Sequence, residues 1–284
     1  MANRIVRLAD CTHAEVRVLA RDPRAVVLLP LGAIEQHGPH LPLAVDWLGA
    51  EEIARRIAAH LIRGGYRPVL APSIPYGVST LAIGWSGTVS LSQPTLRRLV
   101  TEIVGALADH GFCRFVLTNY QADPDHLRVI GQVVRDVERA RRVQVLVGGF
   151  APGAPPENAM ANPRVRMLMR SAAPEHEWHA GEVETSVMLS VAPRLVRRAV
   201  ARRLPSVRVD FSGALRRGVK RFHHIHPGDG YFGSPAVARA DTGRRIMALR
   251  ARLIARELLR ALEGWRPSPR SGSHRTLRSR GSPP

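Results

Sequence analysis

The chain alternates short apolar runs with longer segments in which apolar residues recur at helical spacing. Four runs are apolar on successive positions, as expected for strands covered on both faces. They are AVVLLPLGAI (25–34), YRPVLAPSI (66–74), CRFVLTNY (113–120) and VQVLVGGF (143–150). The pattern predicts an α/β domain built on a mostly parallel sheet.

Five helices are predicted between and after these runs. They span roughly residues 46–62, 94–110, 124–141, 181–193 and 238–262. Asp46 is placed to cap the first helix, and Pro94 opens the second. Residues 151–176, rich in Pro, Ala and Asn, are predicted to form a long connection with a short helix, and connections of this length are often functional.

The composition is that of a globular protein. The chain has 284 residues, of which 45% are hydrophobic, enough for a packed core. We predict one domain over residues 1–264 and a disordered, Ser/Pro/Gly-rich tail over residues 265–284. No apolar run approaches the roughly 20 residues that span a bilayer, and the N-terminus lacks the apolar segment of a secretory signal. We therefore expect a cytoplasmic protein without a membrane partner.

The net charge of +19 raises the question of a nucleic-acid partner. Of the 42 basic residues only Lys220 is a lysine, which indicates a compositional preference for arginine rather than a selected patch. Five arginines lie in the predicted tail, and an aromatic content of 5% supplies no platform for stacking bases. We predict no nucleic-acid partner.

Polar residues follow the first apolar run, where ligands gather in open α/β sheets. Glu35 and His37 lie two positions apart and therefore project to one side of an extended chain. The Gly and Pro residues after them turn the chain back toward Asp46. Two carboxylates and an imidazole suit Zn²⁺, Mn²⁺ or Fe²⁺. Taken singly, the three can be a surface acid, a loop histidine and a helix cap; together they favour a metal site.

Two later clusters repeat this arrangement. Gln121, Asp123 and His126 follow the third run and can face the same cleft, although an Asp-Pro turn with Asp123 or Asp125 as a helix cap explains them equally well. In EHEWHAGEVETS (175–186), His179, Glu182 and Glu184 stand at the mouth of a predicted helix. His179 suits a general acid or base beside a metal-activated water. The alternative is a capping box made by Glu182, with His179 exposed.

Four segments together resemble the creatininase (creatinine amidohydrolase) family, over roughly residues 5–262. They are LPLGAIEQHGPHLPLAVD (29–46), SGTVSL (86–91), HAGEVETSVML (179–189) and GYFGSPAVARADTGRR (230–245). The resemblance implies a three-layer α/β/α sandwich, often assembled as a homohexamer. It also implies a hydrolytic site with two metals.

The resemblance also implies roles for individual residues. Glu35 and His37 would be terminal ligands of different metals, and Asp46 would bridge the pair. His179 would be the catalytic histidine. The other residues that it marks are Glu177 as a second catalytic candidate, Ser79, Tyr120 and Trp178 at the substrate, and Glu184 as a further ligand.

The chain departs from the family pattern after the third run. The family's Asn-Gly-His becomes Asn119-Tyr120-Gln121, so that Gln121 replaces a metal-binding histidine, while Asp123 keeps a carboxylate near it. His126, or the cluster His223, His224 and His226, can compensate, although a solvated loop suits that cluster better. The outcomes are two metals with Gln121 or a borrowed histidine, one metal on His37, Asp46 and Asp123, or none. We favour one or two ions of Zn, Mn or Fe per chain.

These observations lead to a hypothesis of a metal-dependent hydrolase. A metal-bound hydroxide would attack the amide carbonyl of a small, possibly cyclic substrate, and His179 would carry a proton to the leaving group. Family resemblance extends the choice of bond to a formamide or a peptide bond near a C-terminus, and the altered third motif argues against creatinine. The alternatives are a hydrolase that opens a keto-inositol-type ring by C–C cleavage, and a metal-poor binding or assembly protein.

Overall fold

A five-stranded parallel sheet forms the centre of the molecule. The computed structural model describes residues 4–152 and 162–265, so most of the predicted tail and part of the predicted 151–176 connection lie outside the described residues. The sheet has the order β1-β3-β2-β4-β5, with every neighbouring pair parallel. Its strands are β1 (Val6–Arg7), β2 (Ala25–Leu31), β3 (Arg67–Leu70), β4 (Arg114–Asn119) and β5 (Gln144–Gly149). The four predicted strands are confirmed.

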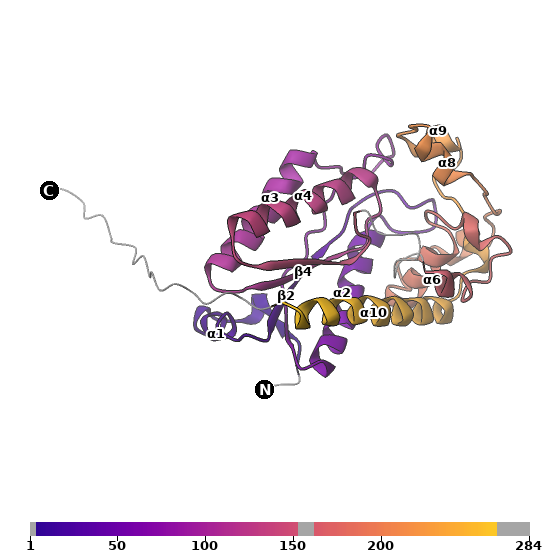
Figure 1. The fold of residues 1–284 in the computed structure, drawn as a ribbon. Helices are drawn as coiled ribbons and strands as arrows, with labels where there is room; N and C mark the ends of the chain where they lie inside the picture. The colour runs from indigo at the N-terminus through magenta and orange to yellow at the C-terminus, as the bar shows by residue number, and fades with distance from the viewer. Residues whose placement is uncertain (1–3, 153–161, 266–284) are drawn as a thin grey trace.

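Helices cover both faces of the sheet (Figure 1). Alternate residues of β2 face opposite layers: Val26 and Leu28 pack in the cluster with α2 (Val45–Arg63), α6 (Glu182–Val191) and α10 (Ala240–Glu263). Leu29 and its alternate neighbours pack with α3 (Gln93–Asp109) and α4 (Pro124–Ala140). All seven residues of β2 are buried, which explains the unbroken apolar run in the sequence. The three-layer α/β/α sandwich is confirmed.

The predicted helices form where expected, with one difference at a cap. Ser92 accepts from Thr95 N at the start of α3, and Asp123 accepts from Asp125 N at the start of α4. At α2, however, the cap position belongs to Ala44, and Asp46 lies inside the first turn. The prediction that Asp46 caps this helix is therefore wrong, because the cap lies two residues earlier, at Ala44, and the Asp46 side chain is buried.

Shorter elements surround this framework. They are α1 (His13–Leu19), α5 (Pro163–Arg166), α7 (Arg198–Ala201), α8 (Phe211–Arg216), α9 (Phe222–Ile225) and the 3₁₀ turns η1 (Leu8–Asp10), η2 (Pro174–His176) and η3 (Pro235–Val237). Among them, α8 and α9 stand apart from the sheet at the same end of the molecule as α6 (Figure 1). Phe211 of α8 and Phe222 of α9 pack with Leu81 and Phe232 in a small separate cluster.

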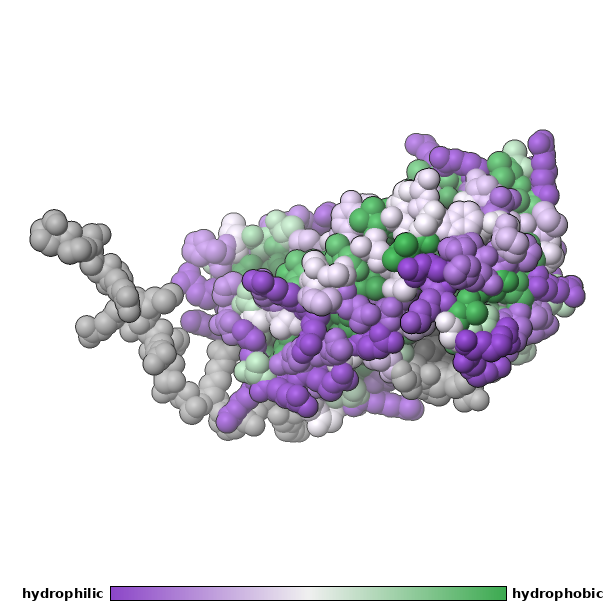
Figure 2. Space-filling model, turned by 90° about the horizontal axis from the view of Figure 1, so that it is seen from above, coloured by the Kyte–Doolittle hydropathy of each residue, from purple (hydrophilic) through white to green (hydrophobic). Residues whose placement is uncertain are grey.

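The surface is mixed in character. Seen from above, hydrophilic side chains project around the edge of the molecule and smaller hydrophobic patches lie between them (Figure 2). Within the described residues, no helix combines the length and the apolar character that crossing a membrane requires.

Candidate metal centre

The loop after β2 brings Glu35, His37 and Asp46 together. Glu35 N donates to Leu43 O at 3.0 Å, which folds the loop back on itself, and Gly38 makes the turn with a φ of 67°. At the strand end, a Cβ on Gly32 would stand 2.4 Å from the Cα of Trp47, so only glycine allows α2 to start this close to β2. The sequence motif thus becomes one compact group at the carboxyl end of the sheet.

His37 points a free nitrogen at two carboxylates. Its Nδ1 lies 3.2 Å from Glu35 O, while its Nε2 lies 3.7 Å from Asp46 Oδ1 and 3.7 Å from Glu184 Oε2. The side chains of His37 and Asp46 are only 1% and 3% exposed. Within the described residues, His37 Nε2 and Asp46 Oδ2 have no hydrogen-bond partner.

Buried polar atoms without partners call for an explanation, and a cation supplies one. Two groups have ligand atoms within 4.8 Å of one another: Glu35 with His37 and His179, and His37 with Asp46 and Glu184. Imidazole and carboxylate are the donors that Zn²⁺ and Mn²⁺ accept in proteins. The residues at this point therefore fit a divalent metal ion.

The electrostatics of the pocket point the same way. Burial raises the pKa of Glu35 to about 8 and raises that of Asp46 well above its ordinary range, and neighbouring carboxylates add to both shifts. Burial also lowers the pKa of His37 to about 4, which keeps the imidazole neutral and able to ligate. Several carboxylates crowded into a dry site form an environment that a cation stabilises.

His179 lies against this group. Its ring is held between His37 and Phe222, with centroid separations of 4.3 and 4.4 Å. Its Nε2 lies 3.0 Å from the backbone oxygen of Gln36 and 3.2 Å from the side-chain Nε2 of Gln36. Burial lowers the pKa of His179 to about 3, so the ring is neutral at rest. The alternative considered from the sequence, an exposed His179, is wrong, because the His179 side chain is buried.

The helix that follows His179 presents Glu184 to the metal group. Ala180 has a φ of 50° and turns the chain into α6, and its N–H donates to Glu184 Oε2. Glu182 makes no capping box. One oxygen of its carboxylate accepts from Arg170 N at 2.7 Å, and the other accepts from Ser171 N at 2.7 Å. Glu182 therefore anchors the preceding segment, and the capping-box alternative is wrong.

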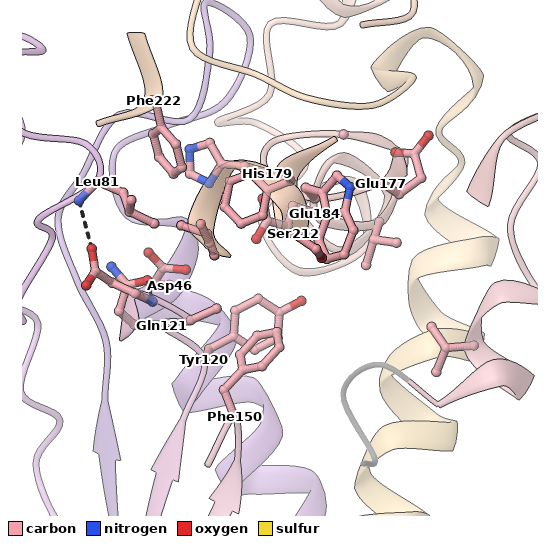
Figure 3. A pocket seen from close by; sticks show the side chains of 18 of the residues that line it. Asp46, Leu81, Tyr120, Gln121, Phe150, Glu177, His179, Glu184, Ser212 and Phe222 are labelled. Carbon is pink, nitrogen blue, oxygen red and sulfur yellow. Dashed lines mark hydrogen bonds between the residues drawn. The ribbon is translucent and has the colours of Figure 1, made fainter. Parts of the chain in front are cut away.

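Gln121 and Asp123, predicted as ligands, are bound to protein groups instead. Gln121 Nε2 donates to Glu35 Oε2 and, at 3.2 Å, to Ser79 Oγ, while its Oε1 accepts from Asp123 N at 3.0 Å. Asp123 accepts from Leu81 N at 2.8 Å, the contact drawn in Figure 3, and from Asp125 N at 2.9 Å. Neither residue belongs to the two groups that could share a cation. Asp123 thus has the helix-cap role weighed from the sequence.

The histidines considered as substitutes lie elsewhere. His126 is fully buried, and its Nδ1 accepts from Val78 N at 3.2 Å. His223 and His224 are exposed and pack on each other, and His226 accepts from Gly228 N at 3.1 Å. Within the described residues, none of these four joins a cation-sized group.

A cavity of about 520 Å³ opens onto the metal group. Its polar part is made by Glu35 and by Asp46, Gln121, His179 and Glu184, which are labelled in Figure 3. The apolar wall is made by Leu81, Phe150, Met169, Trp178, Phe211 and Phe222. Trp178, 39% exposed, stacks on Phe211 at 5.3 Å, so the wall is partly open to solvent.

The other predicted substrate residues differ in position. Tyr120 lines the cavity, and its hydroxyl accepts from Arg250 Nη1 at 3.0 Å. Ser79 is fully buried beside Gln121 and is not among the residues that line the cavity. Glu177 lines the cavity. Its Oε2 accepts from Glu182 N at 2.5 Å and from Ser234 N at 3.2 Å, which connects two segments of the chain.

Arg250 is a cavity residue that the sequence analysis did not single out. It lies on α10 four positions after Ile246 and four before Ile254, both of which are buried. A charged residue on the apolar face of a helix is the signal that could have identified it, because a buried charge needs a partner.

The chain matches a known family over most of its length. The creatininase family, described as creatinine amidohydrolase, matches residues 9–258. The chain belongs to the creatininase family. Mycofactocin precursor peptide peptidase from Mycobacterium tuberculosis (strain CDC 1551 / Oshkosh) is 31% identical over 258 residues, covering 86% of either chain. Creatinine amidohydrolase from Pseudomonas putida is 31% identical over 196 residues, covering 64% of this chain and 69% of the relative.

Solved creatininases share the fold. A manganese form of creatininase is 25% identical, covers 91% of this chain and 99% of its own, and superposes with a TM-score of 0.69. A zinc form gives 25% identity, the same coverage and a TM-score of 0.68. The relatives named above are a peptidase and an amidohydrolase. This chain is therefore a hydrolase of the creatininase family.

Proposed function

We propose that this chain is a metal-dependent hydrolase that cleaves the C–N bond of a small amide, with a peptide bond beside an apolar or aromatic group as the preferred target. The observation that carries the proposal is the pair of partnerless buried ligand atoms, His37 Nε2 and Asp46 Oδ2, beside a cavity lined by His179.

The metal group would be drawn from Glu35, His37, Asp46 and Glu184. When bound there, a divalent cation would supply an electrophile that polarises a scissile carbonyl and favours ionisation of a water molecule. His179 is neutral at rest and lines the cavity, so it can take a proton and return it to a leaving nitrogen. Manganese and zinc are the ions in the solved relatives, and we propose one of these as the cofactor.

The cavity wall supports an apolar substrate group. Leu81, Phe150, Phe211 and Phe222 surround the approach to His179, and an aromatic or branched side chain would displace water from them. A relative that matches most of this chain acts on a precursor peptide, which favours a peptide bond over a cyclic amide. A homohexameric, cytoplasmic enzyme remains the prediction made from the sequence.

The experiment is a hydrolysis screen with purified chain supplied with Zn²⁺ or Mn²⁺. Short peptides with apolar or aromatic residues near the C-terminus are compared with cyclic amides, creatinine included, and new amino groups are quantified. In His179→Gln, kcat is expected to fall by about 10²–10⁴-fold while metal content stays unchanged. A chain that binds such peptides without turnover, with or without His179, would favour the binding-protein alternative.

A further inference from the structure

The two groups that can hold a cation compete for one atom. Both include His37. Its Nδ1 faces Glu35 O at 3.2 Å, which leaves Nε2 as the only nitrogen open to a metal. A neutral imidazole that donates through one nitrogen offers a single lone pair at the other. His37 can therefore serve one cation and not two.

The group that contains Glu35 is closed by Gln121. The Gln121 amide nitrogen donates to Glu35 Oε2 and to Ser79 Oγ, and its oxygen is turned to Asp123 N. Gln121 thus presents N–H groups, which carry partial positive charge, to the space beside Glu35. A cation there would meet donors where it needs lone pairs, and Glu35 Oε2 already accepts a hydrogen bond from the Gln121 amide.

The group of His37, Asp46 and Glu184 has ligand atoms at suitable spacing, although Glu184 Oε2 also accepts a hydrogen bond from Ala180 N. Ligand atoms about 2.1 Å from a tetrahedral ion lie about 3.4 Å from one another. His37 Nε2 is 3.7 Å from Asp46 Oδ1 and 3.7 Å from Glu184 Oε2, which is close to that spacing. A single ion between the three would also give His37 Nε2 the partner that it lacks.

We infer that this chain binds one divalent cation, between His37, Asp46 and Glu184, and that the Gln121 amide takes the place of a second cation at Glu35. Two carboxylates and a neutral imidazole balance the charge of +2. Asp123, which accepts two backbone N–H groups, is not a ligand. The inference rests on the metal dependence of the proposed function and fixes the number and position of the ion.

Metal stoichiometry tests the inference without any substrate. The full chain is stripped with a chelator, loaded with excess Zn²⁺, freed of unbound metal by gel filtration and analysed for zinc per chain. We expect one Zn²⁺. Two per chain, or none, would overturn the inference.

Variants locate the ion. Glu184→Gln keeps an oxygen for Ala180 N–H but loses the charge, and is expected to bind Zn²⁺ at least about tenfold more weakly. Asp123→Asn is the matched control and is expected to keep one Zn²⁺. Gln121→His removes the amide from Glu35 and adds a lone pair, so its zinc content should rise toward two. Unchanged affinity in Glu184→Gln, or loss of zinc in Asp123→Asn, would contradict the assignment.

Two further measurements show whether a loss of zinc binding reflects the metal site or a failure to fold. Circular dichroism checks that each variant is folded; if Glu184→Gln is not, a Co²⁺ titration of the unaltered chain must still saturate at one equivalent. A chain that binds one Zn²⁺ but hydrolyses none of the amides would support this inference and contradict the proposed function alone.

Discussion

Gln36 is the residue that gives His179 a partner in both of its protonation forms. When Nε2 of His179 carries a proton it can donate to the Gln36 backbone oxygen, 3.0 Å away, and when it does not it can accept from the Gln36 amide at 3.2 Å. The amide is itself held by Gly230 O at 2.9 Å, and its oxygen accepts from Gly38 N at 2.9 Å. A histidine that gains and loses a proton in each turnover benefits from such a neighbour, because neither form is left unsatisfied.

Replacing Gln36 should therefore affect proton transfer more than binding. In Gln36→Met, a change of similar size, we expect kcat to fall about tenfold and its pH profile to shift, with KM and zinc content little altered. The measurement is kcat and KM against pH on the best peptide of the screen. Gln132→Met, on α4 away from the cavity, is the control. An unchanged pH profile in Gln36→Met would show that Gln36 is only a packing residue.

At the scale of the elements, long periodic segments were predictable and short ones were not. Strands β2 to β5 and the five long helices follow from apolar runs and helical spacing, because packing on the sheet imposes those patterns directly. Strand β1 has only two residues and leaves no pattern to detect. The short helices α8 and α9 are fixed by contacts with distant residues, such as Phe222 with Leu81, which no local pattern encodes.

The contact between α6 and α10 is close enough to require glycine. A Cβ on Gly243 would stand 2.0 Å from Ser186 O, a backbone atom that cannot move aside. We expect Gly243→Ala to lower the free energy of unfolding by about 1–3 kcal/mol through overpacking, measured by denaturant unfolding. Gly264→Ala, at the end of the same helix with its nearest atom 3.7 Å away, should leave stability almost unchanged. Equal effects in the two variants would mean that helix propensity, and not the contact, is responsible.

At the scale of the whole molecule, the site joins segments that lie far apart in the sequence. Glu35, His37 and Asp46 could be predicted together because one short loop carries them, and His179 and Glu184 because they share a motif. The contact of Gln121 with Glu35 and that of Arg250 with Tyr120 cross the fold. For that reason the sequence could not show whether Gln121 and Asp123 face a metal or are already bonded to protein.

The metal should stabilise the whole chain, and more so at higher pH. Burial raises the pKa of the ligand Asp46, so in the metal-free protein its carboxyl group tends to hold a proton that opposes a cation, and this competition fades as pH rises. At 100 times Kd, Zn²⁺ contributes about 2.7 kcal/mol of stability. Thermal unfolding with and without Zn²⁺ at pH 6 and pH 8 should show the larger shift at pH 8. An equal shift at the two pH values would mean that the binding group is already ionised at pH 6 and would contradict the prediction.

The amide of Gln121 has a consequence for the history of such sites. Glutamine and histidine codons differ only in the third base, so the side chain that closes one cation position and the side chain that would open it are a single point mutation apart. The fold around position 121, with its strand end and its helix cap, needs no change in either case. The single-ion site inferred above and a two-ion site would thus be separated by one substitution within the same fold.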